Sequence, residues 1–356
     1  MSEAVFVTLD STHTRATARV PTQHHSTPAP TPGSLEQAYV PDMQQVMDKA
    51  FALRREHFPG EIAFHAPGLR RYKTTEYTDQ DHRRFVSISL TGAECALACD
   101  HCNMSILKSM APLPRFGGSL FEMCSELARQ GVGGVLVSGG SDKKGRVPLL
   151  KHIPDLVRVR RELGMTIRVH PGIPDEATVA ALAGVGIDGA MMDIIGDNDT
   201  IRDVYHLADT TTEHYERALA LLDRYGVPSI PHIILGLHYG QMRGEQQALE
   251  IIARHHHRAV VLVILMPLSG APMVHVTPPP VEEIMRFFAH TRLTLPESPV
   301  MLGCARPVGQ SKLQTDRAAV DAGFNGIAYP AEGIISYARQ RGLQPKLINA
   351  CCGVQW

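Results

Sequence analysis

A short apolar run followed by a helical segment recurs eight times between Phe85 and the end of the chain. Eight such units in about 250 residues predict a (β/α)8 TIM-type barrel, complete or partial. Continuous apolar runs are typical of parallel strands buried on both faces. Periodicity alone leaves an open, doubly wound sheet as the alternative. The runs are Phe85–Leu90, Gly134–Ser138, Thr166–His170, Gly189–Ile194, Ser229–Leu235, Val260–Met266, Val300–Cys304 and Gly326–Tyr329.

The helical segments between these runs often end at a glycine suited to a left-handed C-cap. These glycines are Gly131, Gly164, Gly184, Gly226, Gly323 and Gly342. In a barrel of this kind the chemistry lies on the loops that follow the strands. We therefore look for candidate site residues directly after each apolar run.

The residues before Phe85 divide into two parts. Residues 1–33 are rich in Thr, Ser, His and Pro without apolar periodicity, so we expect a flexible tail. Apolar residues at helical spacing then predict a helix over Ser34–His57. We assign residues 34–83 to an N-terminal helical extension and residues 84–356 to the barrel domain.

Composition narrows the class of protein. The chain is 44% hydrophobic and 20% charged, with a formal net charge of -1, which argues against a dedicated nucleic-acid binder. No apolar stretch approaches the ~20 residues of a membrane span. The N-terminus lacks the order of a secretory signal, so we expect a cytoplasmic protein without a membrane partner. Seven cysteines in a reducing compartment point to metal or redox chemistry.

Three of the cysteines, Cys95, Cys99 and Cys102, lie within eight residues directly after the first run. Thiolates this close can hold one compact inorganic core, and cysteine is the usual ligand of iron–sulfur clusters. Three ligands leave one iron of a cubane open. A structural zinc site usually takes two ligand pairs, and no second Cys/His pair lies nearby in the sequence. Zinc binding and simple packing of thiols remain as alternatives.

This Cys-x3-Cys-x2-Cys spacing after the first strand resembles the signature of the radical S-adenosylmethionine (SAM) superfamily. The resemblance implies a 4Fe-4S cluster on the three cysteines, with SAM bound at the open iron and cleaved to a 5′-deoxyadenosyl radical. It also implies that Gly139, Gly140 and Ser141, after the second strand, meet the amino group of the methionine moiety. Asp193, at the end of the fourth run, would contact the cofactor ribose; an ordinary turn cap is the alternative.

The remaining cysteines include a second set. Cys304 ends the seventh run, and Cys351 and Cys352 are adjacent near the end of the chain. If they meet at the barrel mouth, three ligands would support a second cluster. Spare thiols are the alternative, and adjacent cysteines diverge in extended chain, so both need not bind.

Within the biotin-synthase-like branch, the overall pattern resembles the two-component lipoyl synthases more than biotin synthase, whose cysteines on strands two and five are missing here. The matching features are Phe64–Gly68 with Tyr72, the cysteine motif, Asp193–Gly196 and the late cysteines. This resemblance implies that the second cluster is a sacrificial sulfur source and that the substrate is an octanoyl-derived chain on a small carrier protein. It further implies a partner lipoyl synthase component and an electron donor.

Two rival interpretations remain. One is another biotin-synthase-like enzyme, which rearranges a carbon skeleton or matures a metallocofactor. The other is a nonenzymatic iron–sulfur or zinc scaffold that serves a larger assembly.

Overall fold

Parallel strands form a single sheet in the computed structural model, which describes residues 41–66, 72–77 and 84–352. The strands are β1 (Glu61–His65), β2 (Phe85–Ser89), β3 (Ala111–Pro112), β4 (Gly134–Ser138), β5 (Thr166–Val169), β6 (Gly189–Asp193), β7 (Ser229–Leu235), β8 (Val260–Ile264), β9 (Val300–Leu302), β10 (Gly326–Ala328) and β11 (Gln344–Ile348). Their order is β11-β1-β10-β9-β8-β7-β6-β5-β4-β2-β3, and every pair is parallel. The two strands at the ends of this order, β11 and β3, do not pair with each other, so the barrel is not closed and the sheet is a partial barrel.

All eight strands predicted from the apolar runs are confirmed, each within two residues of its expected bounds. Burial on both faces explains why they could be recognised: every residue of β8 is buried. Alternation along β8 sends Val261 and Val263 to the inner side, while Val260 and Leu262 pack in the larger core.

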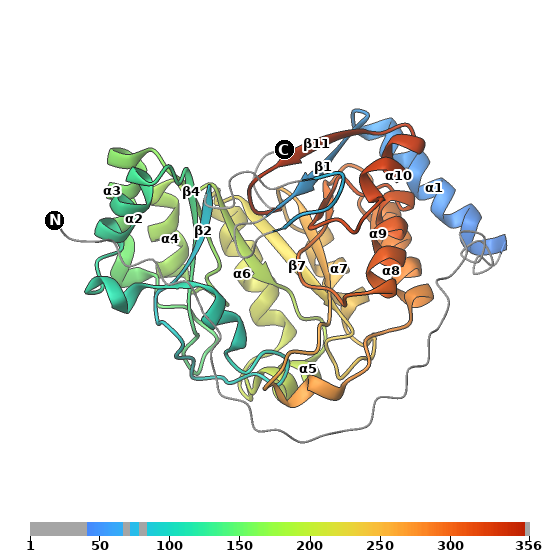
Figure 1. Ribbon diagram of the computed structural model, residues 1–356. Coiled ribbons are helices and arrows are strands. Elements are labelled where there is room, and N and C mark those ends of the chain that lie inside the picture. The colour runs from blue at the N-terminus through green and yellow to red at the C-terminus, as the bar shows by residue number, and fades with distance from the viewer. Residues whose placement is uncertain (1–40, 67–71, 78–83, 353–356) are drawn as a thin grey trace, which may run out of the picture. The chain divides into compact units, whose positions relative to one another are not determined.

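The structure adds three strands to the eight that were predicted. Strand β3 pairs with β2 at one edge. Strand β1 lies between β10 and β11, so the first and last strands of the described chain are side by side (Figure 1). Residues of the predicted 34–83 extension therefore contribute to the sheet itself.

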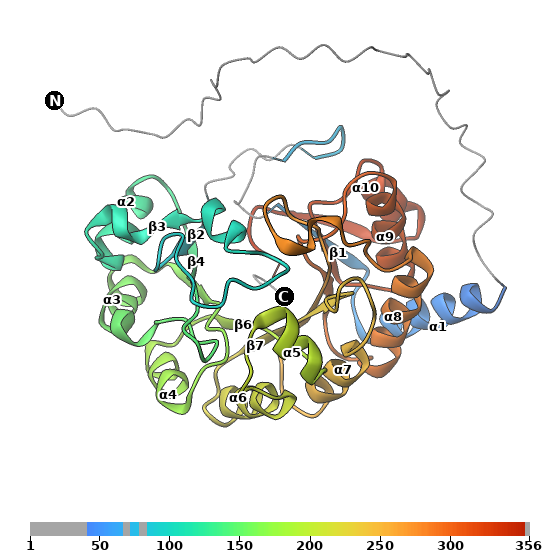
Figure 2. The ribbon, with the colours of Figure 1, turned by 90° about the horizontal axis from the view of Figure 1, so that it is seen from below.

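Most helices cover the outer side of the sheet, where they form an arc outside the strands, while α5 lies inside that arc (Figure 2). They are α1 (Pro41–His57), α2 (Leu120–Arg129), α3 (Ile153–Arg158), α4 (Glu176–Val185), α5 (Asn198–Tyr205), α6 (Thr212–Arg224), α7 (Glu245–Ala253), α8 (Val281–Thr294), α9 (Gln310–Asp321) and α10 (Ile334–Gln340). Short 3-10 helices occupy Ser105–Ser109, Leu113–Phe116, Leu150–His152 and Pro272–His275, and a π-helical turn, Val159–Leu163, continues α3. Side chains cap several N-termini: Asp175 accepts from the Thr178 amide at the start of α4.

Two local expectations differ from the structure. Gly184 is not a left-handed cap, because α4 continues to Val185 and the cap is Gly186, with φ of 72°. Helix α5 was not anticipated, since its short polar segment resembles a loop. Its N-cap is Asp197, whose carboxylate accepts from the Thr200 amide.

Some expectations concern parts of the chain that the structure does not describe. The predicted tail, residues 1–33, lies outside the described residues. The predicted helix from Ser34 is seen from Pro41 onward, as α1, which packs against α8 and α9. No helix in the described ranges has the length and apolar character needed to cross a bilayer.

Candidate functional site

The carboxyl ends of the strands surround a cavity of about 370 Å³. All ten residues singled out from the sequence line it. They are Cys95, Cys99, Cys102, Gly139, Gly140, Ser141, Asp193, Cys304, Cys351 and Cys352. The parallel sheet explains this convergence, because the residues that follow parallel strands meet at the same edge. Both thiol sets therefore face one chamber.

The first thiol set lies on the loop after β2. The ligand atoms of Cys99, His101 and Cys102 are within 4.8 Å of one another, and Cys95 lies outside that group. Cys95 Sγ accepts a hydrogen bond from the Ser141 amide at 3.3 Å, which ties this loop to the one after β4. A cubane spreads its ligands over separate iron atoms, so three thiols that do not converge on one point are compatible with it.

Cys99 and Cys102 interact directly. Their mutual hydrogen bond lowers the pKa of the Cys102 thiol, and the neighbouring His101 lowers it further. The same hydrogen bond, together with burial, raises the pKa of Cys99. The thiolate is the metal-binding form, so both thiols lose their protons when they bind a metal.

His101 packs against Tyr205, with ring centroids 5.0 Å apart. Its Nδ1 atom is buried and has no hydrogen-bond partner in the structure. A buried polar atom without a partner is costly and suggests a group that binds there. His101 and the three thiols thus fit an iron–sulfur cluster with a polar ligand beside it.

The glycine-rich segment after β4 lies directly against the cysteine loop. A Cβ atom on Gly140 would come 1.9 Å from the Glu94 carbonyl oxygen and 2.7 Å from Cys95 Cβ. The Gly140 amide also donates to Thr91 Oγ1 at 2.7 Å. Close packing of two loops therefore requires glycine at this position, in addition to the cofactor contact that the resemblance implies.

Asp193 ends β6 inside the cavity, where Tyr205 Oη donates to its carboxylate at 3.3 Å and His170 Nε2 lies 3.8 Å away. Burial raises the pKa of Asp193, but the nearby imidazoles of His170, His232 and His101 outweigh this effect and bring the pKa to about 2. The carboxylate is therefore charged near neutral pH. No lysine or arginine lines the cavity along the described chain.

The second thiol set is assembled by strands distant in sequence. Strand β11 pairs with β1 and delivers Cys351 and Cys352 to the inner side of the sheet, against which Cys304 packs. The hydrogen bond with Cys351 raises the pKa of Cys352, as do burial and the nearby Cys304. The three thiols are therefore neighbours, although they do not converge on a single point within 4.8 Å.

Two buried basic residues accompany this second set. Arg306 donates to the Gly303 carbonyl oxygen at 2.5 Å and pairs with Asp316 at 2.6 Å, so its charge is already balanced. Arg168, on β5, is 2% exposed and interacts electrostatically with Cys351.

Histidines and tyrosines outside the ten predicted residues also line the cavity, among them His170, Tyr205, Tyr215 and His232. Burial lowers the pKa of His232 to about 4, so its imidazole is neutral. His170 directly follows β5, and that position is the signal that could have identified it, whereas His232 lies in the middle of β7. Tyr205 and Tyr215 come from helices α5 and α6.

Comparisons with known proteins bear on the fold. No family model matches the chain, and a search of curated proteins finds no match. Solved structures do match: a methylornithine synthase, at 14% identity and a TM-score of 0.56, covers 85% of this chain and 89% of its own.

The FeFe-hydrogenase maturase HydG matches at 13% identity and a TM-score of 0.61, over 87% of this chain and 70% of that one. HydG from Carboxydothermus hydrogenoformans matches at 12% identity and a TM-score of 0.53, over 85% and 72% of the two chains. At such identities the likeness concerns the fold alone. The chain shares the partial α/β barrel fold of these proteins, with cysteines gathered at the carboxyl end of its strands.

Proposed function

We propose that this chain is a radical SAM enzyme whose first cluster is held by Cys95, Cys99 and Cys102. The observation that carries the proposal is the meeting of these thiols with the Gly139–Ser141 segment and Asp193 around one cavity. The charge distribution agrees, because a cavity whose described lining includes the Asp193 carboxylate and no lysine or arginine suits a sulfonium ligand. When bound, SAM at an open iron supplies a radical that removes hydrogen from unactivated carbon.

The chain's own residues would hold and shield this chemistry. Asp193, charged and beside Tyr205, can accept hydrogen bonds from ribose hydroxyls. Gly139 and Gly140 allow the backbone to approach the methionine moiety closely. The apolar inner residues Met191, Ile234 and Val263 exclude water from the cavity.

We further propose that the reaction is sulfur insertion into an octanoyl-derived chain carried by a lipoyl-carrier protein. Cys304, Cys351 and Cys352 would hold a second 4Fe-4S cluster that supplies the sulfur. Both thiol sets line the same cavity, which supports this proposal because the substrate carbon must come close to both clusters. A partner lipoyl synthase component and an electron donor belong to the same proposal.

A second candidate is a carbon-skeleton rearrangement or a step of metallocofactor maturation. It is favoured by the structural likeness to a methylornithine synthase and to a hydrogenase maturase. This candidate does not require the second cluster to lose sulfur.

Metal analysis of anaerobically reconstituted protein is the first experiment. Two cubanes predict about eight irons and as many sulfides per chain. Cys304→Ala is expected to reduce iron to about four per chain while SAM cleavage continues. Cys124→Ala is the matched control, since Cys124 is buried on α2 and does not line the cavity. A single zinc ion bound through Cys99, His101 and Cys102, with no iron, would instead indicate a scaffold.

Substrate is tested with octanoyl-lysyl and mercaptooctanoyl-lysyl peptides under reducing conditions with SAM. Mass spectrometry is expected to show sulfur gain by one of them and none with Cys304→Ala. SAM cleavage without sulfur gain on either peptide would contradict sulfur insertion and favour the second candidate.

A further inference from the structure

Asp100, between the cluster cysteines Cys99 and Cys102, accepts two side-chain hydrogen bonds from distant loops. Tyr239 Oη lies 2.8 Å from Asp100 Oδ2, and His206 Nε2 lies 3.1 Å from Asp100 Oδ1. Neither donor lines the cavity, and neither does Asp100. The Asp100 carboxylate therefore makes its contacts on the outer side of the loop, whereas the thiols of the same loop face the cavity.

The backbone of Asp100 is held on two further sides. Its amide donates to the Val204 carbonyl oxygen at 2.9 Å, and its carbonyl oxygen accepts from the Met273 amide at 3.2 Å. Asn103 donates from Nδ2 to the Gly270 carbonyl oxygen at 2.8 Å. The loop is thus fastened to the end of α5 and to the segment after β8.

Both side-chain donors have a left-handed backbone, which is uncommon outside glycine. The φ angle is 59° at His206 and 49° at Tyr239. Within the cysteine loop, three more residues share this conformation: Ala98, Asn103 and Met104. Conformations of this kind cost free energy and persist where surrounding contacts enforce them. Several such residues lie in the cysteine loop or at the donors to Asp100, which indicates that the contacts around Asp100 enforce this backbone conformation.

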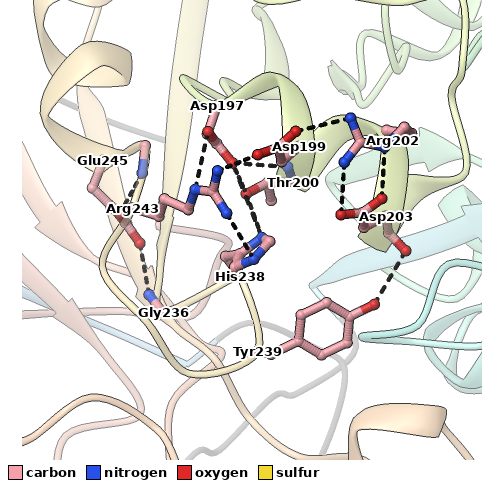
Figure 3. Close-up of polar contacts among 11 residues, drawn as sticks. Asp197, Asp199, Thr200, Arg202, Asp203, Gly236, His238, Tyr239, Arg243 and Glu245 are labelled. Atoms are coloured by element: carbon pink, nitrogen blue, oxygen red, sulfur yellow. Dashed lines mark hydrogen bonds and ion pairs between the residues drawn. The ribbon is translucent and has the colours of Figure 1, made fainter.

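The Tyr239 loop rests on a network of its own (Figure 3). His238 Nδ1 lies 3.1 Å from Thr200 Oγ1 on α5, and Arg243 Nε pairs with Asp197 at 3.3 Å. Glu245 accepts from the Gly236 amide at 2.7 Å, which closes the loop at its other end. Figure 3 also shows the Tyr239 hydroxyl near the Asp203 carbonyl oxygen, at 3.2 Å. These hydrogen bonds and the ion pair therefore hold the loop that carries Tyr239.

We propose that Tyr239 and His206 are positioning residues that act through Asp100 to hold the cluster loop in its metal-binding conformation. This inference rests on the proposed function, since it concerns the cluster on Cys95, Cys99 and Cys102. A loop free to open would let the thiols separate and release iron. The two donors hold the closed form because hydrogen bonds to a charged carboxylate are stronger than neutral ones.

The test compares Tyr239→Phe with Tyr225→Phe, a matched control. Tyr225 Oη also donates to a surface carboxylate, Glu176, at 2.9 Å, but far from the cysteine loop in sequence and outside the cavity lining. In the reconstituted protein, release of iron to a chelator is expected to accelerate about fivefold in Tyr239→Phe and to stay unchanged in the control. The reduced cluster's paramagnetic resonance spectrum is expected to broaden only in Tyr239→Phe.

A second measurement uses the cluster-free protein. Amide hydrogen exchange in residues 95–104 is expected to be faster in Tyr239→Phe than in the parent or the control. Combining Tyr239→Phe with Asp100→Ala is expected to add nothing to Asp100→Ala, since the hydroxyl acts through that carboxylate. Unchanged exchange and iron release in Tyr239→Phe, with a cluster present in the parent, would overturn this inference alone. A parent protein that holds no iron would overturn the proposed function and this inference with it.

Discussion

Replacing Gly140 by alanine would test how closely the β4 loop and the cluster loop are packed. The added Cβ would lie 1.9 Å from the Glu94 carbonyl oxygen and 2.6 Å from Cys95 Cα, and such contacts essentially never occur below 3.0 Å. One loop must therefore move by more than an ångström. Forced overpacking of this kind costs about 1–3 kcal/mol of stability. A ligand displaced by about 1 Å lowers a reaction rate by about 100-fold.

The assay is chemical denaturation of the cluster-free protein, followed by iron analysis and SAM cleavage after reconstitution. Gly139→Ala is the milder comparison, because its Cβ would lie 3.3 Å from the Leu90 and Thr91 amide nitrogens and from Thr91 Oγ1, and a shift of a few tenths of an ångström relieves such contacts. In the cluster-free protein we expect Gly140→Ala to lose stability and Gly139→Ala to lose much less. If Gly140→Ala keeps the parent's unfolding midpoint and iron content, the packing argument is wrong.

Three further substitutions are informative. Asp316→Asn leaves the buried Arg306 without its counter-charge and is expected to lower the free energy of unfolding by about 3–5 kcal/mol. The control, Glu162→Gln, removes a surface ion pair and is expected to cost under about 1 kcal/mol. Equal denaturation midpoints for the two variants would contradict this prediction. Burial lowers the pKa of His232 from 6.5 to about 4, so between these two pH values His232 binds a proton in the unfolded chain but not in the folded one. Stability should fall by about 3 kcal/mol as pH drops through that window, and His232→Phe should flatten the decline in acid denaturation curves. Asp193→Asn is expected to weaken SAM binding about tenfold in calorimetry, and unchanged affinity would contradict the ribose contact.

Periodicity revealed the eight strands of the barrel because each is short, apolar and buried on both faces. It missed β11, whose residues are mostly exposed or half-buried, and β3, which has only two residues. It missed β1 because that strand comes before the repeating pattern, and its place between β10 and β11 depends on pairing across most of the chain.

The first thiol set was visible from spacing, since Cys95, Cys99 and Cys102 are close in sequence and any loop keeps them near one another. The second set was an expectation about distant residues. Cys351 reaches Cys304 because β11 pairs with β1, and no local pattern encodes that pairing.

Local chemistry thus revealed which residue types belong to the site, because ligand spacing and the ends of apolar runs are short-range properties. Their arrangement came from folding. The sheet gathers ten residues around one cavity. Three separate segments form hydrogen bonds with Asp100, and such bonds between distant loops form only after the strands have paired.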